Sequence, residues 1–195
     1  RETLAAACVQ AAGIGAEQVI WDPFCGAGTV AIEALLSDRP TWRASRRYAF
    51  ESWPTHDGAG WAEYTAGLDL TPDLSARAIA SDLDPAALTA ARGNAADAGV
   101  SDRLTLLEGD FEAIVEQVPT GAAVLCNPPY GKRMGRHGLG ELLTRFGHVL
   151  SRRRDLRPVA VLSGAPGFGR GTGLRWETRL RLNNRGLRVR LFVLD

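Results

Sequence analysis

The four residues Asn127-Pro128-Pro129-Tyr130 are the part of this sequence best suited to chemistry. An aromatic amino group is a poor nucleophile, because its nitrogen lone pair is delocalised into the ring. Two acceptors that hold the amino hydrogens can direct that lone pair at an electrophilic methyl group, and the Asn127 side-chain oxygen and the Pro128 carbonyl could supply them. The two prolines fix the backbone, and Tyr130 could stack on a base taken out of its helix. A rigid turn alone would explain the prolines, but not the Asn and the Tyr.

A second set of residues is suited to holding a nucleoside. Residues 22–29, DPFCGAGT, follow a short apolar run, and glycines at a strand–helix turn let the backbone approach a ligand closely. Asp82 could accept hydrogen bonds from both hydroxyls of a ribose, whereas Asp84 is better placed to cap the following helix. Asp110 could accept a hydrogen bond from an adenine amino group, with Phe111 packing on the adenine ring. A lone glycine pair is weak evidence, so the acidic residues carry this prediction.

These segments all lie where strands of a parallel sheet would end. Apolar runs alternate with helical patterns, which predicts an α/β fold with a doubly wound, Rossmann-like, mostly parallel sheet. Residues 183–186, NNRG, predict a C-terminal antiparallel hairpin at one edge. Ligands bind such sheets beyond the carboxyl ends of the strands. The predicted strands span 19–21, 76–80, 104–107, 122–126, 159–162, 177–182 and 187–194, and the predicted helices span 4–12, 29–36, 85–98 and 139–150.

Residues 38–75 interrupt this alternation. The acidic residue that follows the glycines normally comes about 20 residues later, whereas Asp82 comes more than 50 residues after Gly28. We therefore predict an insertion at about 38–75 within a single catalytic domain of residues 1–195. The tryptophans of the insertion are expected to be more often buried than exposed.

Composition and charge narrow the function further. The chain has no apolar run long enough for a membrane span, and its three widely spaced cysteines predict neither disulfides nor a metal site but a reducing, cytoplasmic setting. Residues 1–130 hold 8 basic and 18 acidic side chains, whereas residues 131–195 hold 15 basic and 4 acidic ones. This asymmetry predicts that the C-terminal third contacts a polyanion such as RNA. Lys132 and Arg133 are the expected phosphate contacts.

Taken together, the segments resemble the class I S-adenosylmethionine-dependent methyltransferases that act on exocyclic amines. Residues 1–5 (RETLA), 22–33 (DPFCGAGTVAIE), 81–85 (SDLDP) and 127–135 (NPPYGKRMG) resemble the THUMP-associated RNA guanine-N2 methyltransferases. Residues 47–54 (RYAFESWP) and 182–186 (LNNRG) resemble the bacterial branch that modifies large-subunit ribosomal RNA. Ala27 departs from the family, which usually has Ser there.

The resemblance implies methyl transfer from S-adenosyl-L-methionine to an exocyclic amino group of an RNA base, most of all guanine N2 in ribosomal RNA. It also implies a separate RNA-binding THUMP domain before the catalytic domain, which we expect to be absent from this sequence. The expected catalytic residues are Asn127, Pro128, Pro129 and Tyr130. The expected cofactor-binding residues are Asp22, Pro23, Cys25, Gly26, Gly28, Thr29, Asp82, Asp110, Phe111 and Asn127.

Other functions remain open from the sequence. The same turn would serve a tRNA guanine-N2, a DNA adenine-N6 or a protein glutamine methyltransferase. An RNA-binding module with a vestigial methyltransferase fold is a non-enzymatic alternative, although such a module would be free to lose Asn127 and Asp82. A nucleotide-binding oxidoreductase is disfavoured, because no hydride-transfer site accompanies the glycines.

Overall fold

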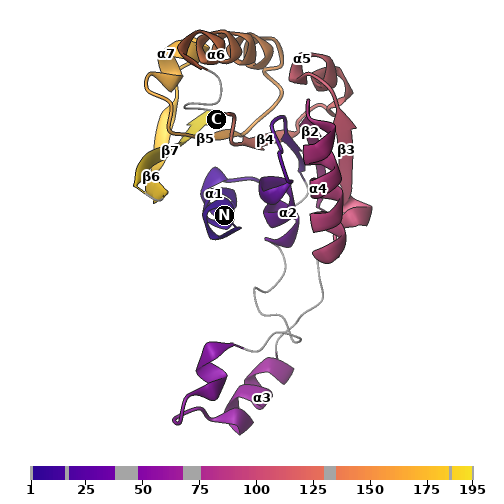
Figure 1. The fold of residues 1–195 in the computed structure, drawn as a ribbon, viewed down its shortest axis with the longest axis vertical. Helices are drawn as coiled ribbons and strands as arrows, with labels where there is room; N and C mark the ends of the chain where they lie inside the picture. Colours follow the sequence, from indigo (N-terminus) through magenta and orange to yellow (C-terminus); the bar gives the residue numbers. More distant parts are fainter. Residues whose placement is uncertain are drawn as a thin grey trace.

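A computed structural model describes residues 2–15, 18–37, 48–67, 76–129, 135–184 and 186–194. Within these residues seven strands form one sheet in the order β3-β2-β1-β4-β5-β7-β6 (Figure 1). The first five are parallel, whereas β7 is antiparallel to both β5 and β6. The predicted doubly wound sheet and its C-terminal hairpin are therefore confirmed. The strands are β1 (Val19–Asp22), β2 (Arg77–Asp82), β3 (Leu104–Glu108), β4 (Ala123–Cys126), β5 (Val159–Ser163), β6 (Glu177–Asn184) and β7 (Leu187–Leu194).

Helices cover both faces of the sheet. α1, α2 and α4 contribute to one hydrophobic core and α5, α6 and α7 to the other, so the sheet lies between two layers (Figure 1). None of the described helices is long and apolar enough to cross a membrane. The α-helices are α1 (Glu2–Ala12), α2 (Thr29–Leu36), α3 (Gly58–Ala66), α4 (Pro85–Asp97), α5 (Phe111–Ile114), α6 (Gly135–Arg152) and α7 (Phe168–Thr172), and the 3-10 helices are η1 (Ala49–Ser52), η2 (Ser101–Arg103) and η3 (Val115–Gln117).

The central strands are buried on both sides, as a sandwiched parallel sheet requires. All residues of β4 and β5 are buried. Trp21 in β1 is fully buried, and its indole N–H donates to the Ser81 hydroxyl across the neighbouring strand at 3.2 Å. A buried indole normally has such a partner. This bond ties β1 to β2 one residue before each strand ends, beside the predicted site residues.

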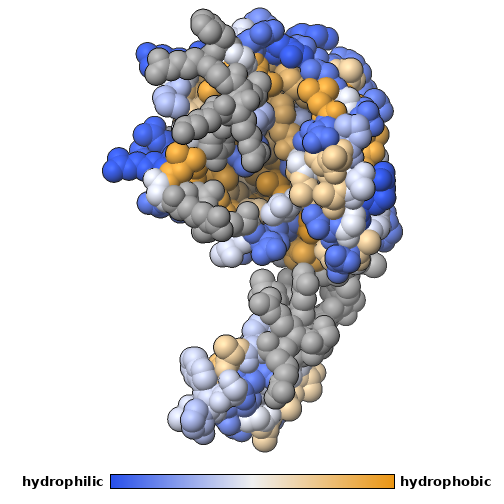
Figure 2. All heavy atoms as spheres, viewed as in Figure 1, coloured by the Kyte–Doolittle hydropathy of each residue, from blue (hydrophilic) through white to orange (hydrophobic). Residues whose placement is uncertain are grey.

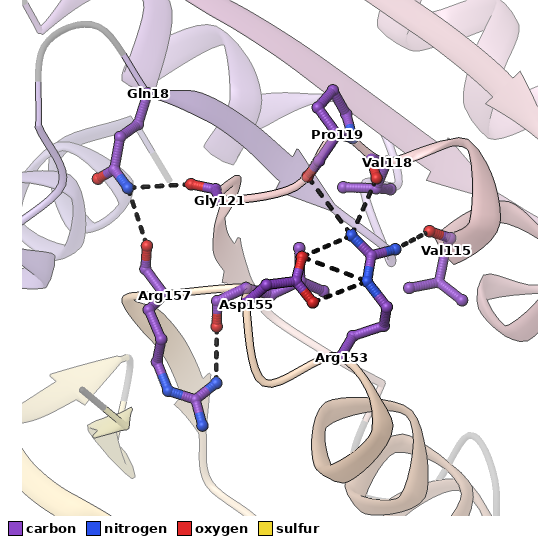
Figure 3. Close-up of polar contacts among 9 residues, drawn as sticks. Gln18, Val115, Val118, Pro119, Gly121, Arg153, Asp155 and Arg157 are labelled. Carbon is purple, nitrogen blue, oxygen red and sulfur yellow. Dashed lines mark hydrogen bonds and ion pairs between the residues drawn. The ribbon is translucent and has the colours of Figure 1, made fainter.

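A polar network braces the opposite, amino edge of the sheet (Figure 3). Arg153, just after α6, pairs with Asp155 at 2.8 Å and donates to the carbonyls of Val115 and Val118. The hydrogen bond from Arg153 holds the pKa of Asp155 down at about 2. Gln18 donates to the carbonyls at the approaches to β4 and β5. The hydrogen bonds at the amino edge of the sheet are thus structural, and a ligand site is expected at the carboxyl edge.

The predicted insertion contains its own small unit, residues 48–67, which lies apart from the sheet in Figure 1. Asp57 caps α3, and Trp61 packs edge-on against Phe50 at 5.0 Å. The expectation of buried tryptophans is wrong for Trp53, whose side chain is 62% exposed. The unit is too small to enclose an indole of that size. Trp42 lies outside the described residues.

Replacing Gly147 with alanine should destabilise the fold. An added Cβ would overlap the backbone carbonyl of Thr172, because α6 and α7 touch at that point. Overpacking of this kind costs about 1–3 kcal/mol of unfolding free energy. Gly140, on the same helix, has nothing within 4 Å of an added Cβ, so Gly140→Ala should be neutral or stabilising by up to about 1 kcal/mol. Chemical denaturation of both variants checks this, and equal stabilities would contradict it.

Candidate active site

A cavity of about 1330 Å³ opens at the carboxyl edge of the sheet. It exceeds the roughly 300–1,000 Å³ of typical small-molecule sites, so it can hold a nucleoside cofactor and part of a second ligand. Figure 2 shows this face hollowed, with hydrophobic residues inside and hydrophilic ones along the rim. The fold brings eleven of the predicted site residues to its walls: Asp22, Pro23, Cys25, Gly26, Thr29, Asp82, Asp110, Phe111, Asn127, Pro128 and Pro129.

Asp82 anchors the glycine loop. One carboxylate oxygen accepts the backbone N–H of Gly26 at 2.8 Å, and the other accepts that of Asp84 at 3.0 Å. The Cys25 N–H donates to the Ser81 carbonyl, which holds the same loop against the end of β2. Asp84 itself caps α4 by accepting from Ala86 at 2.9 Å, so the predicted capping role is confirmed.

Gly28 plays a packing role. It has a left-handed backbone with φ 80°, and an added Cβ would lie 3.1 Å from the Ala91 Cβ of α4. It is not among the residues that line the cavity. This glycine therefore lets α2 begin close to α4, whereas Gly26 lies on the cavity wall.

Asp22 is a buried carboxyl group at the end of β1. Its side chain accepts the Phe24 N–H at 3.1 Å, yet the residue is only 1% exposed. Burial, reinforced by the negative charge of Asp82, raises the pKa of Asp22 to about 7. Burial makes the Asp22 carboxyl group costly to ionise, so a positive charge in the cavity would stabilise its ionised form.

Asp110 and Phe111 are held by Arg145 of α6. Asp110 caps α5 through the Glu112 N–H and pairs with the Arg145 guanidinium at 2.7 Å. Partial burial raises the pKa of Asp110, but the hydrogen bonds from Glu112 and Arg145 outweigh it and lower the pKa overall. Arg145 also lies over the Phe111 ring, 5.1 Å from its centroid. Asp110 is thus a fixed, ionised acceptor at the cavity wall.

The three cysteines, Cys8, Cys25 and Cys126, also line the cavity. Burial raises the pKa of all three thiols, that of Cys8 to about 11. They are therefore neutral thiols rather than nucleophilic thiolates. Among the described residues no group of three or more His, Cys, Asp or Glu side chains is arranged to hold a metal ion.

The turn after β4 presents its amide to the cavity. Pro128 is buried, whereas Asn127 and Pro129 are exposed on the cavity wall. The Asn127 side chain makes no hydrogen bond in the part of the chain that the structure describes. Its acceptor oxygen is therefore available to a ligand. Tyr130, Lys132 and Arg133 lie outside the described residues.

Some wall residues were not predicted as site residues. Leu4, Ala5 and Cys8 of α1 and Leu187 of β7 line the cavity, and so do Glu141 and Arg145. The four-residue spacing of Glu141 and Arg145 on a predicted helix indicates a shared face. No signal in a single sequence pairs Arg145 with Asp110, 35 residues earlier.

The sheet order, the cavity at its carboxyl edge and the terminal hairpin define a class I methyltransferase fold. A structure from Clostridium difficile 630, described as a possible methylase, has a TM-score of 0.82 and 25% identity, covering 99% of this chain and 52% of that one. SMU.472, described as "a putative methyltransferase complexed with SAH" (S-adenosylhomocysteine), has a TM-score of 0.79 and 24% identity, covering 99% of this chain and 52% of that one.

Residues 1–184 match the family described as "RMKL-like, methyltransferase domain", and the chain belongs to that family. The chain is similar to the ribosomal RNA large subunit methyltransferase K/L of Chromohalobacter salexigens, with 31% identity over 100% of this chain, and to that of Vibrio campbellii, with 31% identity over 96%. It spans only 28% of either relative's length. The predicted resemblance to the large-subunit branch is confirmed. The methyl donor of this family is S-adenosylmethionine.

Proposed function

We propose that this domain transfers a methyl group from S-adenosylmethionine to an exocyclic amino group of ribosomal RNA, with guanine N2 as the target. The observation that carries the proposal is that one cavity is lined both by the Asp82-anchored glycine loop and by the Asn127 amide, which is not hydrogen-bonded within the described residues. The first suits a nucleoside cofactor, and the second suits a planar amine. The large-subunit relatives support ribosomal RNA as the substrate.

We propose that a separate carboxylate on the cavity wall interacts with each of three parts of the cofactor. Asp82, at the end of β2, would accept the ribose hydroxyls, and Asp110, at the end of β3, the adenine amino group. The hard-to-ionise Asp22 would lie near the positive charge of the bound cofactor. Bound S-adenosylmethionine supplies an electrophilic methyl group on a sulfonium.

The residues of the turn act on the amine. The Asn127 side-chain oxygen and the Pro128 carbonyl would accept the two amino hydrogens and turn the nitrogen lone pair towards the methyl carbon. Bound S-adenosylmethionine would supply the methyl group: its S–C bond would break, with the electron pair left on sulfur, as the amine nitrogen formed the new N–C bond. The methylated nitrogen, now cationic, loses a proton to water. No strong protein base is required, because a cationic methylated nitrogen gives up its proton readily.

The proposed placement predicts a pH dependence for cofactor binding. Asp22 is protonated below pH about 7 and ionised above it. A cation favours the ionised form, so affinity for S-adenosylmethionine should rise as pH increases from 6 to 8. SAH lacks the sulfonium charge, and its affinity should change less over the same range. Titration calorimetry at both pH values checks this, and identical pH profiles for the two ligands would contradict it.

The relatives' greater length supports a further part of the proposal. The domain would work within a longer cytoplasmic enzyme whose other parts, including an RNA-binding domain, help to select the substrate. The insertion at 38–75 would be an appendage of the catalytic domain.

Two measurements test the proposal. Calorimetric titration should show micromolar binding of S-adenosylmethionine and none of NADH, and the reverse result would indicate an oxidoreductase. Transfer of a labelled methyl group should then be compared on unmodified ribosomal RNA, transfer RNA, DNA and protein offered in competition. We expect the label in ribosomal RNA. Label in DNA or protein, or cofactor binding without any transfer, would overturn the proposal.

A further inference from the structure

The hairpin of β6 and β7 extends past the end of its neighbour at the cavity side of the sheet. Ser163 is the last residue of β5 and pairs with Arg190 of β7. The part of β7 before Arg190, and the part of β6 that pairs with it, therefore lie beyond the carboxyl edge. The segment that follows β5 lines the cavity, as does Leu187 at the start of β7. The free end of the hairpin thus stands at the cavity rim.

This end carries three arginines on one face, which we call the arginine face: Arg181, Arg188 and Arg190. Arg181 lies directly opposite Arg190, and Arg188 lies opposite Asn183. All three are exposed, whereas Val189 and Leu191, which alternate with them, are buried on the other face. The alternation of side chains along a strand puts the three guanidinium groups on one side of the ribbon.

Among the residues that the structure describes, the arginine face has none of the acidic partners that other arginines have. Like charges directly opposite on two strands destabilise the pair, and in the described ranges none of these three arginines forms an ion pair. Arg145 and Arg153, by contrast, each pair with a carboxylate within 3 Å. Like charges held opposite one another without acidic partners among the described residues favour a surface that meets an anionic partner.

We infer that the arginine face binds backbone phosphates of the RNA strand that carries the target base into the cavity. The inference rests on the proposed function and names the contact that positions its substrate. Arg188 and Arg190 are about 7 Å apart along the strand, which is on the scale of neighbouring phosphates in a single strand. Guanidinium groups bind phosphate oxygens in pairs of parallel hydrogen bonds. Such contacts fix the register of the strand without reading its sequence.

The test uses two double variants that remove the same charge from opposite edges of the sheet. Arg181→Ala/Arg190→Ala removes the directly opposed pair of the arginine face, and Arg152→Ala/Arg154→Ala removes two exposed arginines near the end of α6, at the amino edge. The probe is unmodified large-subunit ribosomal RNA transcribed in vitro, and its dissociation constant is measured over a range of KCl concentrations. S-adenosylmethionine affinity and the melting temperature are measured on the same samples.

We expect the arginine-face variant to bind the RNA at least tenfold more weakly. Its salt dependence, the slope of log K against log [KCl], should fall by about 0.7 for each phosphate of a single strand that the variant no longer neutralises. The amino-edge variant should bind nearly as the parent does, and both should keep the cofactor affinity. The melting temperature of the arginine-face variant should be unchanged or higher, because a like-charge pair has been removed.

Equal losses of RNA affinity in the two variants would mean that only net charge matters. No loss of affinity in either variant would mean that the RNA binds along another surface. Either result would overturn the inference. So would tighter binding of the parent to poly-aspartate than to the RNA, which would indicate an acidic protein partner. The proposed function fails separately. If the arginine-face variant loses RNA affinity while the parent never methylates the RNA, the surface stands and the methyl-transfer proposal does not.

Discussion

Replacing Asn127 with alanine is expected to reduce methyl transfer by roughly 10²–10³-fold, the loss found when one preorganised hydrogen-bonding group is removed from an active site. The reason is that the amide oxygen is proposed to act on the amine and makes no hydrogen bond to the described part of the protein. Affinity for S-adenosylmethionine should stay close to that of the parent. Single-turnover methylation of ribosomal RNA, together with cofactor titration, measures both quantities.

The exposure of Asn127 and a second variant, Asn127→Gln, allow the effect of Asn127→Ala to be assigned to the amide. The side chain is exposed on the cavity wall, so its removal leaves no buried cavity and, within the described residues, no unpaired hydrogen-bond partner. Asn127→Gln keeps the amide but moves it by one methylene, and it should also be slow if position is what matters. Near-normal turnover in the alanine variant would show that the turn after β4 does not activate the amine.

Replacing Asp82 with alanine is expected to weaken S-adenosylmethionine binding by about 1.5–3 kcal/mol, on the order of 10- to 100-fold in the dissociation constant. The variant loses the acceptor proposed for the ribose. It also loses the carboxylate that holds the Gly26 and Asp84 amides at 2.8 and 3.0 Å. Isothermal titration of the variant and the parent with the cofactor gives the two dissociation constants.

Asp84 provides the matched control for Asp82. It lies two residues away, is exposed and caps α4 by accepting the Ala86 N–H, whereas the Gly26 N–H donates to Asp82. Asp84→Ala should lower the unfolding free energy by about 1 kcal/mol, because the helix loses its cap, and should leave cofactor affinity nearly unchanged. If both alanine variants lost cofactor affinity equally, the loss would reflect α4 rather than a ribose contact, and the assignment of Asp82 would fail.

The sequence predicts the framework of this domain because its signals are local. Thr29–Leu36 is helical as predicted, and the other long elements differ from their predicted bounds by a few residues at most. Hydrophobic alternation and capping residues specify such elements within a few neighbours. The convergence of Asp22, Asp82 and Asn127 on one cavity follows from the rule that parallel strands present their carboxyl ends at one edge.

What the sequence could not predict depends on contacts between distant segments. The helices α5 and α7 have four and five residues, too short for a periodic pattern. Arg145 is recognisable as a site residue only once α6 lies against the start of α5. The exposure of Trp53 likewise depends on the small size of the unit around it. The average burial of tryptophan side chains does not predict the burial of one tryptophan in such a unit.

We propose that this domain methylates an exocyclic amine of ribosomal RNA, with guanine N2 as the target. The most direct measurement is mass spectrometry of nucleosides from unmodified large-subunit ribosomal RNA that has been incubated with the protein and S-adenosylmethionine. We predict N2-methylguanosine, with its amount falling to background in Asn127→Ala. The appearance of N6-methyladenosine instead, or of no methylated nucleoside although the cofactor binds, would contradict the claim.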